Sequence, residues 1–421
     1  MESSNTVQNN EILTSADGTP LRTALARATR RAKWRAFALV APLLIFIIVT
    51  FAIPIGQMLY RSVNNTAFSA NMPNLGEYFE NNEVTGVPGE EAYAALVADL
   101  AQAREKKTIG VVATRVNYEL PGARSQFTSG ARKAKKLEPP FKESLIAVDK
   151  DWDDPHLWSV MQRASNPISA GFYLAAVDMK YDETGQAVRA DSKKRIYVPL
   201  FVRTLWLSAL ISVLCLILAF PVAHLLATLP LRYSNLLMIF VLLPFWTSLL
   251  VRTTAWIALL QSQGVLNDIL VGTNILDDDN RVQLMYNQWG TIIAMTHILL
   301  PFMILPLYSV MKSIPPTYVR AARSLGASSW TAFWKVYFPQ TVPGIGAGIL
   351  LVFILSIGFY ITPALVGGSS GQLISNEIAR HMLQSLNWSL AAALGGILLF
   401  IIIILYWLFD KLIGVDNMKL G

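Results

Sequence analysis

Six long stretches of the sequence contain no acidic residue and almost no basic residue, and this feature constrains the fold more than any other. A helix needs about 20 apolar residues to cross the hydrocarbon core of a bilayer. We therefore predict an all-α polytopic membrane protein with six transmembrane helices, at residues 36–60, 204–229, 234–260, 289–311, 344–366 and 390–409. The composition agrees, because 53% of the 421 residues are hydrophobic and only 15% are charged.

The charges beside these stretches predict how the chain crosses the membrane. Residues 22–35 contain six basic residues and no acid, which places the N-terminus in the cytoplasm by the positive-inside rule. Six crossings return the C-terminus to the same side. The segment 312–339 should then lie inside, and it carries four basic residues and no acid. The outer segment 261–288 carries four acidic residues and one basic residue. The net charge of +7 is explained in this way, and no nucleic-acid partner is predicted.

We divide the chain into four regions. Residues 1–35 are a basic cytoplasmic tail whose polar part, before Arg22, is expected to be mobile. Residues 36–60 are the first span. Residues 61–202 are too long for a turn and too polar for a span, so they are expected to form an extracytoplasmic insertion. Residues 203–421 hold the other five spans.

The insertion is predicted to be a small α+β domain. Residues 89–105 have the apolar pattern of an amphipathic helix. Residues 108–118 and 143–148 are rich in strand-forming residues, and Asp154-Pro155 is typical of a helix start. Four polar residues, Asp151, Asp153, Asp154 and His156, could be metal ligands, but capping of that helix explains them better, and no metal site is predicted.

Catalytic motifs are absent from the sequence. There is no Gly-rich phosphate loop with its Lys and Ser/Thr, no Gly-x-Ser-x-Gly and no His-Glu-x-x-His. Cys215 is the single cysteine, so a disulfide within the chain is excluded. We expect no catalytic residue and no cofactor in this chain. His224 and His297 lie alone on apolar spans and are interpreted as packing residues.

The segment 312–339 has the pattern of two short helices joined by a corner. Pro315 and Pro316 can open a helix over residues 318–325, and Gly326 permits the left-handed turn that closes it. Ser328 is then expected to cap a second helix that passes through four aromatic residues, Trp330, Phe333, Trp334 and Tyr337. The alternative is an ordinary connection between two spans.

The spacing within this segment resembles a known motif. Arg320-Ala321-Ala322 is followed by three residues, Gly326, nine residues, and a run that ends at Pro339. It is similar to the cytoplasmic "EAA" loop of binding-protein-dependent ABC importer permeases, although Arg320 replaces the usual acid. The resemblance implies a coupling loop, residues 312–339, that contacts a separate ATPase through Arg320, Ala321, Ala322, Gly326, Trp330 and Pro339.

Further runs resemble the first permease of the spermidine/putrescine importers. They are Leu-Pro-Phe-Trp-Thr at 243–247 with Arg252, Gly-Val-Leu-Asn at 264–267, Ile-Leu-Leu-Pro-Phe at 298–302 and Leu-Pro-Leu-Tyr-Ser at 305–309. The resemblance covers residues 201–409 and the first span, but not the insertion. It implies a bacterial inner-membrane permease of type I fold that transports a polyamine by alternating access. Its partners would be a second homologous permease, two cytoplasmic ATPase subunits that bind ATP and Mg, and an extracytoplasmic solute-binding protein.

The substrate is less well defined by the sequence. A polyamine is a polycation, yet no Asp or Glu lies in any predicted span. Aromatic faces could bind it instead, so the candidate pathway residues are Phe245, Trp246, Trp256, Phe359 and Tyr360. Packing or interfacial roles are the alternative for these five. An opine or an amino-acid-like solute also fits. Arg252 either extends to the membrane surface or faces the pathway.

Other classes of membrane protein fit less well. An ion-coupled secondary transporter would need ionisable groups inside the membrane, and only Arg252 is present. A channel would need a filter or a charged ring. A membrane-anchored receptor would not need a coupling loop. Co-purification with an ATPase would distinguish a permease from all three.

Overall fold

The computed structural model describes residues 21–182 and 185–413, so the predicted mobile tail lies mostly outside the described residues. The chain divides into two compact units, one ending at Tyr60 and the other beginning at Arg61. The first unit is a long helix with one π-helical turn: α1 (Leu21–Ile47), the turn Ile48–Ala52, and α2 (Ile53–Val63), which runs into the second unit. Residues Ala28–Val63 form a candidate membrane span, as predicted.

The second unit contains four further helices that are long and apolar enough to cross a membrane. They are α11 (Tyr197–Thr228), α15 (Gln288–Ser313), the continuous segment Ser329–Gly358 that ends in α18 (Phe338–Gly358), and α22 (Trp388–Ile413). With the first span these make five, or six when a bent helix pair is counted as one span. The prediction of a helical membrane protein is confirmed among the described residues.

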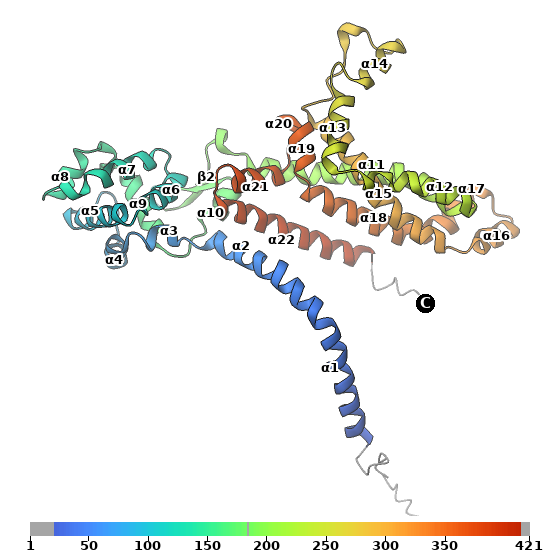
Figure 1. Ribbon diagram of the computed structural model, residues 1–421, viewed down its shortest axis with the longest axis horizontal. Coiled ribbons are helices and arrows are strands. Elements are labelled where there is room, and N and C mark those ends of the chain that lie inside the picture. The colour runs from blue at the N-terminus through green and yellow to red at the C-terminus, as the bar shows by residue number, and fades with distance from the viewer. Residues whose placement is uncertain (1–20, 183–184, 414–421) are drawn as a thin grey trace, which may run out of the picture. The chain divides into compact units, whose positions relative to one another are not determined.

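Three of these helices, α11, α15 and α18, pack side by side around one apolar core (Figure 1). The core contains Leu207 and Cys215 from α11, Met303 from α15 and Val352 from α18. Small residues allow the close approach: a Cβ atom on Gly348 of α18 would lie 2.5 Å from the sulfur of Met303. Close packing of backbones through small residues is the usual way in which membrane helices associate.

The predicted third span, residues 234–260, is broken. It is made of α12 (Leu231–Leu242), a 3-10 turn (Leu243–Trp246) and α13 (Leu249–Leu260), and α14 (Val265–Gly272) follows it; the chain bends by 97° after Trp246 (Figure 1). Pro244 lacks an N–H and cannot continue the α-helical ladder. The Ser248 hydroxyl then accepts a hydrogen bond from the backbone N–H of Val251 and starts α13. The expected third span is therefore present as a bent pair of helices that counts as one candidate span.

The predicted fifth span, 344–366, is also interrupted. α18 ends at Gly358, and α19 (Ile361–Val366) starts after a short break. The remaining elements of this part are a 3-10 turn (Asp278–Asn280), α16 (Pro316–Ser324), α17 (Ser329–Ala332), the π-helical turn Phe333–Tyr337, α20 (Gly368–Gly371) and α21 (Ile374–Leu383).

The insertion is almost entirely helical, which corrects two predictions. Residues 108–118 and 143–148 were expected to be strands, but they lie in α6 (Ile109–Glu119) and around α8 (Phe141–Ile146). The strands that are present pair antiparallel, β1 (Met179–Tyr181) with β2 (Ala187–Arg189). The other helices are α3 (Thr66–Ser69), α4 (Pro73–Asn81), α5 (Glu90–Glu105), α7 (Ala123–Lys133), α9 (Pro155–Ser165) and α10 (Gly171–Ala176), with 3-10 turns at Ala134–Lys136, Lys150–Asp153 and Ser192–Lys194.

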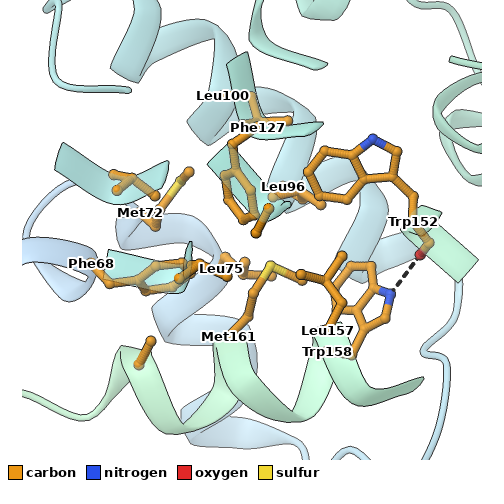
Figure 2. Packing of buried hydrophobic residues seen from close by; sticks show 14 of the residues in the cluster. Phe68, Met72, Leu75, Leu96, Leu100, Phe127, Trp152, Leu157, Trp158 and Met161 are labelled. Atoms are coloured by element: carbon orange, nitrogen blue, oxygen red, sulfur yellow. Dashed lines mark hydrogen bonds between the residues drawn. The ribbon is translucent and has the colours of Figure 1, made fainter. Parts of the chain in front are cut away.

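Two tryptophans are the largest fully buried side chains in the insertion's own core (Figure 2). Trp152 and Trp158 are fully buried, and the Trp158 indole N–H donates to the carbonyl oxygen of Trp152 at 2.9 Å. The hydroxyl of Tyr93 donates to the same carbonyl at 2.8 Å. Burying a large apolar side chain contributes about 1.5–3 kcal/mol to stability, so these two side chains contribute strongly to the core. The predicted cap is confirmed, since the Asp154 carboxylate accepts from the N–H of His156 at 2.8 Å.

Candidate coupling site and translocation face

The coupling loop has the predicted two-helix geometry. α16 begins at Pro316, Gly326 adopts a φ of +89°, and the Ser328 hydroxyl accepts from the N–H of Thr331 at 3.1 Å to start α17. A residue with a side chain is strained in this left-handed region, whereas glycine is not. Pro339, expected at the end of the loop, lies in the first turn of α18.

The corner between the two helices is exposed. Leu325 keeps 89% of its surface accessible and Trp330 keeps 72%. Arg320 and Ala321 are also exposed, whereas Ala322 is half-buried. Large apolar side chains left in contact with solvent mark surfaces that bind a partner. The structure therefore places four of the sequence-predicted coupling residues, Arg320, Ala321, Gly326 and Trp330, on one accessible corner.

A cavity of about 640 Å³ lies behind this corner, between the loop and the ends of α11 and α15. Its lining includes Lys312, Val319, Arg320 and Phe333. One wall is the π-helical turn Phe333–Tyr337, where the hydroxyl of Tyr337 is 3.1 Å from Nδ1 of His224. The prediction that His224 is a packing histidine is consistent with this contact. The π-helical turn, which widens the helix by one residue and is frequent at functional sites, could not be predicted from the sequence.

Two of the predicted pathway residues lie along α15. The ring of Phe245 packs edge-on against Phe302 at 5.1 Å, and the Trp256 indole N–H donates to Nδ1 of His297 at 3.1 Å. His297 was interpreted as a packing histidine, but it is exposed in this chain and bonded to Trp256. Trp246 is 76% exposed at the bend. Phe245 and Trp256 thus each contact α15 through a separate pair, and no ring contact joins the two pairs among the described residues.

Phe359 and Tyr360 occupy the break between α18 and α19. The carbonyl of Phe359 accepts from the Ser375 hydroxyl at 2.6 Å, and that of Tyr360 accepts from the Asn376 amide at 2.8 Å. These two bonds satisfy carbonyls that the broken helix leaves free. Among the described residues, no ring contact joins Tyr360 to Trp256. The five predicted pathway residues are thus not brought together at one point.

Arg252 lies in the first turn of α13 and is partly enclosed. Its Nε and Nη1 atoms are buried and have no hydrogen-bond partner among the described residues. Extension of its guanidinium to the membrane surface and a position facing the pathway both remain predictions. An unpaired buried donor costs free energy, so this arginine is a destabilising feature of the chain as described.

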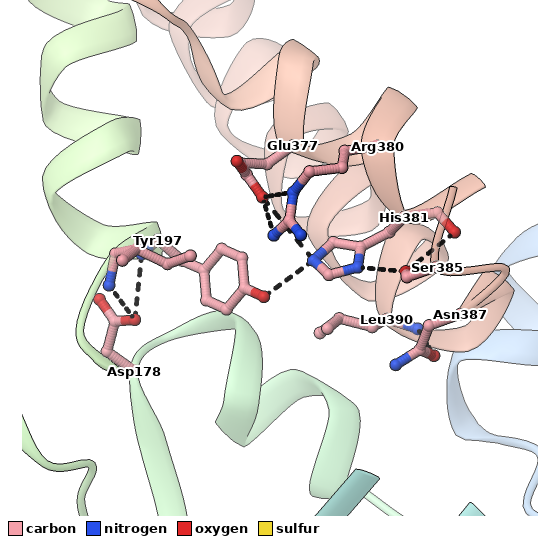
Figure 3. A network of polar contacts seen from close by, with 9 residues as sticks. Asp178, Tyr197, Glu377, Arg380, His381, Ser385, Asn387 and Leu390 are labelled. Atoms are coloured by element: carbon pink, nitrogen blue, oxygen red, sulfur yellow. Dashed lines mark hydrogen bonds and ion pairs between the residues drawn. The ribbon is translucent and has the colours of Figure 1, made fainter. Parts of the chain in front are cut away.

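A polar network that the sequence analysis missed joins the insertion to the span α11 and, through it, to the short helix α21 (Figure 3). Asp178 accepts hydrogen bonds from the backbone N–H groups of Ile196, Tyr197 and Val198 and so caps α11. The hydroxyl of Tyr197 lies 2.9 Å from Nε2 of His381 on α21. Burial, and then the charge of Arg380, lower the pKa of His381, while Glu377 opposes this effect. The insertion is also fixed by apolar contacts, because Phe172 of α10 packs in one cluster with Leu390 of α22.

The chain belongs to the family of binding-protein-dependent transport system inner membrane components, whose model matches residues 197–413. It is therefore a multi-pass inner-membrane permease subunit of an ABC importer, without an ATPase site of its own. Residues 61–196, which are nearly all of the insertion, lie outside the matched residues.

Individual relatives agree with the family. The chain is 32% identical over 234 residues to the spermidine/putrescine transport system permease protein PotB of Haemophilus influenzae, with 54% of this chain and 81% of that protein covered. Identity to PotB of Escherichia coli K12 is 35% over 231 residues, with 53% and 83% covered. A bacterial alginate ABC transporter, solved with its pentasaccharide-bound periplasmic protein, is 21% identical, covers 53% of this chain and 80% of its own, and has a TM-score of 0.46.

Proposed function

We propose that this chain is one of two homologous permease subunits of an ATP-driven importer that takes up a polyamine such as spermidine or putrescine. The observation that carries the proposal is the identity of 32–35% to PotB proteins over the membrane domain. Two cytoplasmic ATPase subunits would bind ATP and Mg, and an extracytoplasmic solute-binding protein would deliver the solute. Both termini and the coupling loop face the cytoplasm, and the insertion faces outward.

Alternating access is the mechanism that this geometry supports. The coupling loop is continuous with α18 through α17 and the π-helical turn, so a push on α16 and α17 is transmitted to the helix that packs on α15. The breaks beside Trp246 and Phe359 divide two helices into segments that can tilt separately. Closure inside and opening outside would then follow from rigid-body movement of these helices.

A second candidate is import of an opine or an amino-acid-like solute. The absence of Asp and Glu from the spans favours it, because a desolvated polycation needs anionic partners. In the polyamine proposal, the carboxylates come from other subunits.

Uptake by whole cells tests the proposal. Cells lacking this chain should take up less radiolabelled spermidine or putrescine than the parent strain, and the chain supplied in trans should restore uptake. An excess of unlabelled polyamine should block the restored uptake, and an excess of an amino acid should not. Competition by an amino acid or opine alone would favour the second candidate.

A further inference from the structure

The coupling loop carries a concentration of positive charge that no acid offsets. Lys312, Arg320, Arg323 and Lys335 lie within 24 residues, and the sequence from Lys312 to Asn376 contains no Asp or Glu. All four side chains are exposed. Among the described residues, none of the four makes an ion pair, although exposed cations elsewhere do, such as Lys135 with Glu105 at 3.0 Å.

Two of the four cations are placed at the cavity behind the exposed corner. Lys312 and Arg320 line it together with the apolar side chains of Met311, Val319 and Phe333. The Lys312 ammonium has one contact, with the carbonyl oxygen of Ala227 at 3.3 Å, and that carbonyl does not neutralise it. The positive-inside rule explains why a cytoplasmic loop is basic. It does not explain why two unpaired cations share an apolar cavity that is open to a partner.

The size and chemistry of the cavity indicate what it binds. A volume of about 640 Å³ falls within the roughly 300–1,000 Å³ of ordinary binding pockets, so it can receive several side chains of a partner. Exposed Leu325 and Trp330 beside it provide apolar anchors, which dominate protein interfaces. The two cations set the sign of the partner's charge, because like charges across an interface are strongly unfavourable.

We propose that the cytoplasmic ATPase presents an acidic segment to this corner, and that its carboxylates bind Lys312 and Arg320 at the cavity. The inference rests on the proposed function and adds the charge of the partner surface. Arg320 then acts as a specificity residue, since the acid that is usual at this position of the motif would repel the same segment.

Rebinding of the ATPase to tagged permease in detergent tests this inference. The ATPase that co-purifies with the wild-type chain is stripped and titrated back onto wild type, Lys312→Glu, Arg320→Glu and the double variant. Each single reversal should weaken binding about threefold to tenfold and the double variant more. Wild-type binding should fall between about 50 mM and about 500 mM NaCl, and the variants should show a shallower dependence. Arg232→Glu, an exposed arginine on α12 outside the cavity, is the matched control and should bind as wild type does.

The outcomes separate the two levels of the proposal. If no ATPase co-purifies with the wild-type chain, the proposed function is wrong and the inference falls with it. If an ATPase binds but neither salt nor the reversals change its affinity, only the inference is wrong. Loss of bound anionic phospholipid in Lys312→Glu and Arg320→Glu, with ATPase affinity unchanged, would assign the two cations to the membrane surface instead.

Discussion

At the scale of single residues, the backbone conformation of Gly326 explains why glycine is required at this corner of the coupling loop. A Cβ atom at this position would meet no other atom within 4 Å, so space is not what excludes a larger residue. The φ of +89° is the constraint. The left-handed conformation costs about 1–2 kcal/mol for most residues and less for asparagine.

Replacement of Gly326 by valine should therefore strain the corner and uncouple ATP hydrolysis from transport. We expect uptake to fall severalfold while the chain still inserts and spans the membrane. Gly326→Asn, which tolerates the same φ, is the matched control and should retain most of the transport. The ratio of solute transported to ATP hydrolysed, measured in the assembled complex, checks this, and a wild-type ratio in Gly326→Val would argue against the coupling role.

His381 predicts a dependence of stability on pH. Its pKa in the folded chain is lowered by burial and Arg380, so the unfolded chain binds the proton more readily. The stabilisation that comes from keeping the His381 imidazole neutral is therefore fully present above about pH 6.5, the ordinary pKa of histidine. It is lost as the pH falls through the lower pKa that His381 has in the folded chain. The groups that face His381 are Tyr197, Glu377, Arg380 and Ser385.

Thermal unfolding of the purified chain measures this effect. Between about pH 7.5 and about pH 5.5 the Tm should fall more steeply for wild type than for His381→Gln, which cannot titrate. Comparison of the two slopes removes the contribution of all other groups. Equal slopes would mean that His381 is as easily protonated in the folded chain as in the unfolded one.

At the scale of helices, the two broken spans were only partly visible in the sequence. Pro244 marks the first break, but the 97° change of direction depends on how α13 packs against α15 and α19. The insertion shows a different limit. Residues 108–118 are rich in β-branched side chains, which favour a strand. The apolar residues of this segment nevertheless have helical spacing and face the core of the insertion, namely Ile109, Val112, Ala113 and Val116.

The aromatic residues at these breaks support a prediction about transport. Trp246→Ala and Tyr360→Ala should slow uptake and leave the preference among solutes almost unchanged, because we propose that most of the selectivity lies in the separate solute-binding protein. A cation–π contact contributes about 0.5–2 kcal/mol, which corresponds to a loss of about twofold to thirtyfold. Trp289→Ala, exposed at the start of α15, is the control. A switch of preference in either variant would place a specific site in the permease itself.

At the scale of the whole molecule, the pattern of spans could be predicted because hydrophobicity and charge are local properties of the sequence. The contacts between residues far apart in the sequence could not be predicted in this way. Trp256 and His297 are 41 residues apart, and Tyr197 and His381 are 184 residues apart. Only the coupling loop was found in detail, since its glycine, prolines and cap are all within one short segment.

The orientation in the membrane is a prediction at this scale. The side chain of Lys135 is exposed in the insertion. A Lys135→Cys variant that also carries Cys215→Ala should react with an impermeant thiol reagent in intact spheroplasts. A cysteine at Arg323, in the coupling loop, should react only after lysis. The reverse pattern would invert the topology and remove the basis for the coupling loop.

The central claim is that this chain forms part of an importer driven by ATP hydrolysis at another subunit. The most direct measurement is uptake of labelled spermidine into proteoliposomes that contain the purified complex, with the solute-binding protein outside and ATP and Mg inside. The account predicts uptake with ATP and none with a non-hydrolysable analogue, and no ATP hydrolysis by this chain alone. Uptake by this chain alone, driven by an ion gradient without ATP, would contradict it.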